Sequence, residues 1–168
     1  LNMQEPEIEE VNILPDPNAS INPTMQTLGT IDNETANIIA PANPANTYKT
    51  AYEMLSRADY ESAEIAFKSF IGENPDDPLA SNAYYWLGET YYVRKFYKQA
   101  ARSFAIGFQK FPNGSKAPDQ LLKLGMSLVS LGKNEDACAT FAKLELEFPD
   151  APSRISNRAS QYIKRAEC

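Results

Sequence analysis

Residues 83–92 read Ala-Tyr-Tyr-Trp-Leu-Gly-Glu-Thr-Tyr-Tyr, and the chain returns to this pattern at a fixed interval. Leu87 and Gly88 recur as Leu124 and Gly125, which lie 37 residues further along the chain. A fixed period of this length is typical of proteins built from stacked helix pairs. The same interval separates three alanines, three phenylalanines and three prolines: Ala63, Ala100 and Ala137; Phe67, Phe104 and Phe141; Pro75, Pro112 and Pro149.

The residues from Tyr48 onward predict an all-α fold. Their apolar side chains recur at the three- and four-residue intervals of amphipathic helices, with no strand-like alternation. Prolines and glycines, which end helices, fall between these stretches. We therefore predict seven helices, at residues 47–57, 60–72, 78–93, 97–110, 115–131, 134–147 and 152–166.

The spacing Tyr84-x2-Leu87-Gly88-x2-Tyr91, followed by Ala100-x3-Phe104 and a proline, matches the tetratricopeptide repeat signature, with Tyr in place of Trp. This match predicts a right-handed superhelix of three helix pairs, at about residues 47–75, 78–112 and 115–149. We expect the small residues to let helices approach closely and the repeated phenylalanines to fill the space between units. A helix at residues 152–166 is expected to cap the stack.

The first 47 residues differ in composition from residues 48–168, which hold the repeats. They carry seven Asp and Glu residues, no Lys or Arg, and half of the twelve prolines. This composition predicts a disordered acidic linker, with a short docking motif at Val11–Leu14 or around Ile38 as the alternative. Because the chain begins with Leu1, we expect that it was processed or truncated, and a signal peptide is compatible with this expectation.

The composition also limits the chemistry that we expect. The chain has no histidine, so Ser-His and Cys-His nucleophile pairs are excluded, and two cysteines alone do not make a structural zinc site. The carboxylate pairs Asp76-Asp77 and Glu135-Asp136 lie in a predicted turn and at a helix start, where capping explains them. We expect no catalytic residue, metal or cofactor. The balanced charge of the repeats argues against nucleic acid, and no apolar run is long enough to span a membrane.

The turns at residues 74–78 and 111–119, the stretch 83–92 and the final Phe148-Pro149-Asp150-Ala151 resemble the C-terminal domain of the CpoB/YbgF family of Tol-Pal system proteins. The resemblance covers residues 48–168. It implies a periplasmic adaptor that couples peptidoglycan synthesis to outer-membrane constriction during division, with TolA and a bifunctional penicillin-binding protein as partners. Family members trimerise through an N-terminal coiled coil, so we expect a trimer only where such a segment is present. The alternative is a scaffold subunit of outer-membrane protein assembly, which normally has more repeats and a lipidated cysteine.

The tetratricopeptide register assigns the first helix of each unit to a partner-binding groove. The expected surface is aromatic, apolar and weakly acidic, which suits a protein segment with apolar anchors and a basic residue and disfavours capture of a C-terminal carboxylate. The alternative is that several tyrosines pack inside the stack. The candidate groove residues are Tyr48, Tyr52, Leu55, Asn82, Tyr85, Glu89, Tyr92, Asp119, Leu122, Met126 and Val129.

Two cysteines lie near the end of the chain, Cys138 early in the second helix of unit three and Cys168 after the cap helix. The end of one antiparallel helix lies near the start of its neighbour, so we favour a disulfide between them. Such a bond needs an oxidising compartment, in agreement with the periplasmic location that the resemblance implies. The alternative is a buried thiol at Cys138 and a free thiol at Cys168.

Overall fold

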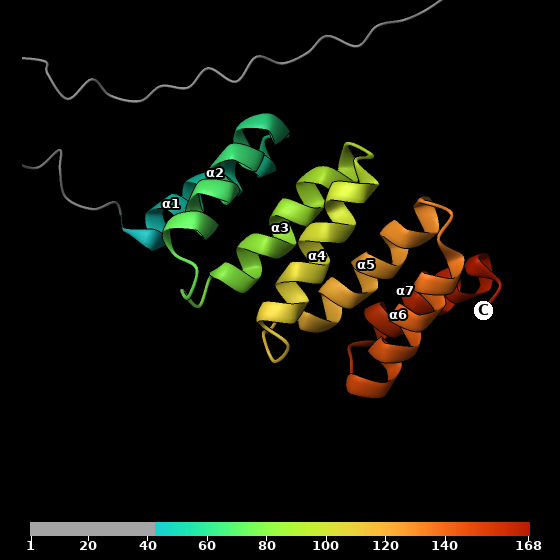
Figure 1. The fold of residues 1–168 in the computed structure, drawn as a ribbon. Helices are drawn as coiled ribbons and strands as arrows, with labels where there is room; N and C mark the ends of the chain where they lie inside the picture. Colours follow the sequence, from blue (N-terminus) through green and yellow to red (C-terminus); the bar gives the residue numbers. More distant parts are fainter. Residues whose placement is uncertain (1–42) are drawn as a thin grey trace, which may run out of the picture. The chain divides into compact units, whose positions relative to one another are not determined.

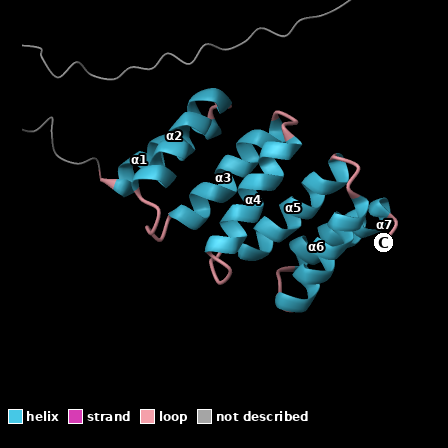
Figure 2. Cartoon of the chain, viewed as in Figure 1, coloured by secondary structure: helices cyan, strands magenta, loops and turns pink. Residues whose placement is uncertain are grey.

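The computed structural model describes residues 43–168, and the expected linker at residues 1–42 lies outside this part of the chain. The described residues form helices joined by short turns, without a strand (Figures 1 and 2). The all-α prediction is confirmed. The helices are α1 (Pro44–Ser56), α2 (Tyr60–Glu73), α3 (Ala80–Val93), α4 (Tyr97–Lys110), α5 (Ala117–Ser130), α6 (Asn134–Glu147) and α7 (Ser153–Ala166).

Four helices begin at other residues than the sequence predicts, and one of them, α7, starts a single residue late, at Ser153. Helix α1 starts at Pro44, where proline suits the first helical position, and the Asn43 side chain accepts a hydrogen bond from the Ala45 N–H at 3.0 Å. Residues 44–47 therefore belong to α1 and not to a linker. Helices α3 and α5 start two residues later than expected, because residues 78–79 and 115–116 still belong to the turns.

Consecutive helices pack side by side as three pairs, and α7 packs against both α5 and α6 (Figure 1). Helix α1 also contacts α3, and α3 contacts α5. The helices α1, α3, α5 and α7 therefore form a row, which we call the inner row. This arrangement is a tetratricopeptide-type superhelix, as predicted. Helix α7 extends the inner row, so it is more than an end cap.

The repeated phenylalanines occupy the space inside each unit. The Phe104 ring of α4 lies against Gly88 of α3, and the Phe141 ring of α6 lies against Gly125 of α5. A Cβ atom would lie only 2.4 Å from the Phe104 ring at Gly88 and 2.5 Å from the Phe141 ring at Gly125, so only glycine permits this approach. In the first unit Ala51 takes the place of the glycine, fully buried. The expectation that these rings separate one unit from the next is therefore wrong.

The turns inside the three units share one conformation. Ala58, Lys95 and Gly132 each have a positive φ, of 60°, 63° and 71°. In each turn this residue donates its N–H to a carbonyl three residues back, and the next residue donates to a carbonyl five residues back. These two bonds define the Schellman motif, which ends a helix with a left-handed residue. The motif folds the second helix of each unit back along the first.

Candidate protein-binding face

The inner row carries all the predicted groove residues, and the structure divides them into packed and accessible side chains. Tyr48 of α1 packs edge-on against Phe67 and Phe70, with ring centroids 6.1 and 5.7 Å apart. Burial raises the pKa of the Tyr48 hydroxyl. Tyr48 therefore belongs largely to the core of the first unit, as the packing alternative predicts.

An aromatic row crosses from α1 to α3. The Tyr52 ring lies 5.0 Å from Trp86, and Trp86 lies 4.9 Å from Tyr85. The Lys116 ammonium lies over both α3 rings, 5.0 Å from the Tyr85 centroid and 5.4 Å from the Trp86 centroid. Tyr52 is exposed, whereas Tyr85 is buried. Trp86 was missed because the repeat register assigns its neighbour Tyr85, and not Trp86, to the inner face.

Glu89 and Lys123 link α3 to α5. The Lys123 Nζ atom lies 2.8 Å from the Glu89 carboxylate, and both side chains are about four-fifths buried. Burial raises the pKa of Glu89, and the neighbouring Lys123 charge only partly offsets this effect. The Lys123 ammonium also lies 4.8 Å from the Tyr92 ring centroid. The Glu89 charge is therefore already compensated within the domain.

Asp119 and Arg154 link α5 to α7 in the same manner. The Arg154 guanidinium donates to both carboxylate oxygens of Asp119, at 2.6 and 3.1 Å. These hydrogen bonds raise the pKa of Arg154. The Asp119 side chain is 8% exposed and the Arg154 side chain 64% exposed, so this pair presents its cation to solvent.

A hollow of about 170 Å³ lies between α3, α5 and α7. We call it the α3–α5–α7 hollow. Its apolar part consists of Tyr85, Leu122 and Met126, which are among the candidate groove residues, whereas its cations Lys123, Arg154 and Arg158 are not. It is lined by Tyr85, Asp119, Leu122, Lys123, Met126, Arg154 and Arg158.

The charge of this surface is opposite to the expected one. Glu89 and Asp119 are each paired with a cation, while Arg158 is exposed on α7. The expectation of a weakly acidic groove is therefore wrong. The error has a physical cause, because the register counts only the first helices of the three units and leaves out α7 and the positions beside the groove.

The remaining candidates do not line this hollow. Tyr92 packs edge-on against Tyr97 at 5.3 Å, and burial raises the pKa of both Tyr92 and Tyr85. Asn82 is half-buried and lies 3.4 Å from the Ser115 hydroxyl. Leu55 and Val129 are also half-buried. These positions are thus only partly accessible to a partner.

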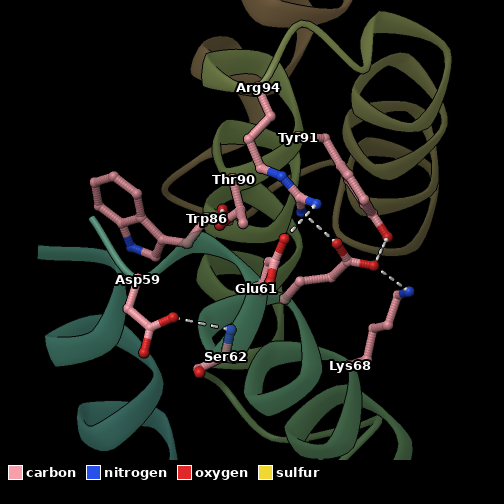
Figure 3. A network of polar contacts seen from close by, with 9 residues as sticks. Asp59, Glu61, Ser62, Lys68, Trp86, Thr90, Tyr91 and Arg94 are labelled. Carbon is pink, nitrogen blue, oxygen red and sulfur yellow. Dashed lines mark hydrogen bonds and ion pairs between the residues drawn. The ribbon is translucent and has the colours of Figure 1, made fainter. Parts of the chain in front are cut away.

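A second polar network, which sequence reasoning missed, joins α2 to the end of α3 (Figure 3). The Glu64 carboxylate accepts hydrogen bonds from Lys68 at 2.6 Å, Arg94 at 2.6 Å and the Tyr91 hydroxyl at 2.9 Å. Burial alone would raise the pKa of Glu64, but these three bonds together lower it below its usual value. The network ties unit one to unit two. No period marks these residues, so no sequence signal indicates it.

The structure bonds Cys138 of α6 to Cys168, which lies 30 positions further along the chain, with the Cα atoms 5.6 Å apart. The bond holds the end of α7 against the start of α6. Among residues 43–168 no cluster of His, Cys, Asp and Glu is suited to a metal ion. Within the same residues, no helix combines the length and apolar character needed to cross a membrane.

Comparisons with known proteins agree with this fold. The tetratricopeptide repeat family model matches residues 121–151. Over 52 residues, 29% of this chain, the sequence is 36% identical to the cell division coordinator CpoB of Pseudomonas putida. The chain spans about a fifth of the length of the curated relatives that it matches.

Two solved structures have the same fold. The type III secretion translocator chaperone SycD of Yersinia enterocolitica, solved in complex with a peptide of the translocator YopD, superposes with a TM-score of 0.67 and 18% identity, covering 77% of this chain and 95% of that one. PcrH from Pseudomonas aeruginosa superposes with a TM-score of 0.65 and 15% identity, covering 86% of this chain and 100% of PcrH. Residues 43–168 therefore have the tetratricopeptide repeat fold, and 52 residues of the chain are similar in sequence to the cell division coordinator CpoB.

Proposed function

We propose that this chain is a periplasmic adaptor of the Tol-Pal system and that its inner row binds a protein segment. The observation that carries the proposal is the α3–α5–α7 hollow, together with the exposed Tyr52, which the aromatic row connects through Trp86 to Tyr85 of the hollow. Aromatic and Arg side chains around a small depression are the usual anchors of a protein interface. A rigid stack of helices presents them without a large ordering cost on binding.

The similarity to CpoB supports a role in division. On this proposal the chain contacts TolA and a bifunctional penicillin-binding protein, and it coordinates peptidoglycan synthesis with constriction of the outer membrane. The protein acts as a scaffold and carries out no reaction of its own. The Tol-Pal role rests on the sequence match with CpoB, whereas the binding face rests on the geometry of the inner row.

The bond between Cys138 and Cys168 supports a periplasmic location. Disulfides persist in oxidising compartments and are rare where thiol reductants are abundant. Protein extracted from the cells that produce it should therefore resist alkylation by iodoacetamide until it is denatured and reduced. Alkylation of native, unreduced protein would contradict the periplasmic assignment.

The test of the function is a calorimetric titration of the whole chain with the helical periplasmic region of TolA. We expect saturable one-to-one binding that is weakened in the Tyr52→Ala variant. The matched control is Ile65→Ala on α2, which also removes an exposed apolar side chain but lies off the inner row. No binding up to high micromolar concentration would reject TolA as the partner, and equal loss in both variants would reject the inner row as the site.

A further inference from the structure

We infer that the α3–α5–α7 hollow recognises an acidic segment of the partner protein, with a carboxylate held by Arg154 and Arg158 and an adjacent apolar side chain seated on Leu122 and Met126. This inference rests on the proposed function, because it names the chemistry of the partner that the inner row binds. It reverses the expectation of a basic partner that the sequence alone supports.

Positively charged side chains outnumber negatively charged ones around the hollow. Lys116, Lys123, Arg154 and Arg158 lie in or beside it, against two carboxylates, Glu89 and Asp119. Each carboxylate is already held by one cation. Among residues 43–168, no carboxylate lies within ion-pair distance of Arg158 or Lys116, so positive charges outnumber negative charges by two at this face.

Arg154 and Arg158 both keep hydrogen-bond donors that the domain does not use. A guanidinium has five N–H donors. Arg154 uses two of them on Asp119, and Arg158 uses one on the Gln161 side chain at 3.2 Å. The fixed geometry of the Arg154–Asp119 pair also positions the remaining donors of Arg154 before any partner arrives. Paired guanidinium donors suit a carboxylate, because the two groups match in a planar, bidentate arrangement.

The lining of the hollow suits a peptide better than other anions. The hollow has an apolar side, formed by the exposed edges of Leu122, Met126 and Tyr85, whose side chains are otherwise buried. A free phosphate or a polyanion backbone offers nothing to cover such a surface. A peptide segment offers both a carboxylate and an apolar side chain, at the spacing of neighbouring residues. The structure therefore favours an acidic peptide with an apolar anchor.

The test uses the whole chain, immobilised through its N-terminus, and a library of random peptides displayed on phage. We expect the selected sequences to be enriched in Asp and Glu beside Leu, Phe or Met. The Arg158→Glu variant should lose this enrichment, whereas Arg165→Glu should keep it. Arg165 is an exposed arginine on the same helix that lies outside the hollow, so the two variants change the charge of α7 equally.

A peptide synthesised from the consensus of the selected sequences then allows the change in Kd caused by each variant to be measured. Reversal of a charge that meets the peptide carboxylate should raise the Kd about tenfold or more, and added salt should also weaken binding. Selected peptides without acidic enrichment, no selected peptides at all, or unchanged affinity in Arg158→Glu would overturn the inference. A selected peptide rich in basic residues would restore the sequence-based expectation.

Failure of this inference can be separated from failure of the proposed function. If the TolA region binds and its affinity is the same in Arg158→Glu as in Arg165→Glu, the inner row binds TolA without a carboxylate contact and the inference is wrong. If the TolA region does not bind but acidic peptides are selected, the hollow has the inferred specificity and the proposed partner is wrong.

Discussion

The turn inside each unit contains one residue in the left-handed conformation. At these equivalent positions, introducing a glycine should stabilise the fold, whereas replacing a glycine should destabilise it. Ala58 and Lys95 have φ values of 60° and 63°, and Gly132 has 71°. A side chain makes this conformation less favourable by about 1–2 kcal/mol. Replacement by glycine removes that cost but adds freedom to the unfolded chain, worth about 0.4–1 kcal/mol. The difference leaves a net effect of about 0.5–1 kcal/mol.

We therefore expect Lys95→Gly to raise the free energy of unfolding by about 0.5–1 kcal/mol and Gly132→Ala to lower it by a similar amount. The Lys95 side chain is exposed, and the structure shows it in no ion pair, so its loss removes no packing. The assay is urea unfolding followed by far-ultraviolet circular dichroism, with the disulfide intact. Comparison of the slopes of the transitions checks that the unfolded state is unchanged.

The matched control is Gly72→Ala. An added Cβ atom would meet nothing within 4 Å at Gly72 or at Gly132, so the two substitutions differ only in backbone conformation. Gly72 lies in the last turn of α2 and should gain about 0.5 kcal/mol from the helix preference of alanine. Equal effects of Gly72→Ala and Gly132→Ala, or destabilisation by Lys95→Gly, would refute the assignment of strain to these turns.

Three further predictions concern packing, pH and the disulfide. Gly88→Ala should lower the free energy of unfolding by about 1–3 kcal/mol, because the added methyl group would lie too close to the Phe104 ring. Adding Phe104→Leu to this variant should restore part of the lost stability, as measured by urea unfolding. The lowered pKa of Glu64 means that its ionised carboxylate stabilises the fold at pH values above the usual pKa of about 4.3. This contribution is lost as the pH falls through the lower pKa of the folded state. In acid unfolding curves, the wild-type protein should therefore lose more stability than the Glu64→Gln variant. Reduction of the Cys138–Cys168 bond, which closes a 30-residue separation, should cost about 3–4 kcal/mol and increase hydrogen exchange first in α7; unchanged exchange would contradict this role.

The fold was predictable because small and large residues recur at equivalent positions of successive units. In units two and three, a glycine is followed 16 residues later by a phenylalanine, at Gly88 and Phe104 and again at Gly125 and Phe141. Because the same pair occurs twice, each occurrence supports the prediction of a contact in the other unit. The period says that Phe104 recurs, but it does not say which neighbour the ring meets. The ring could face its own unit or the next, and the structure shows that it lies on the glycine of its own unit.

The binding face was only partly predictable, because charge at this face depends on pairs that cross between helices. Lys123 does not recur at the repeat interval, since the equivalent position in unit two is Trp86. The Arg154–Asp119 pair depends on how α7 docks on α5, and α7 lies after the last full repeat. Such a pair leaves no periodic signal in the sequence. The repeat register therefore assigns the acidic residues Glu89 and Asp119 to the groove without indicating the cations that pair with them.

Burial of the two inner carboxylates changes what the face can select. An exposed acid would attract a basic partner, but Glu89 and Asp119 are buried and must keep their own cations, since removing either cation would leave an uncompensated charge in the domain. A basic partner would compete with Lys123 and Arg154 for carboxylates that it cannot reach without displacing them. An acidic partner adds its charge to donors that are still available. The Glu89–Lys123 and Asp119–Arg154 pairs therefore have two effects. They join α3 to α5 and α5 to α7, and they leave the binding face with a net positive charge.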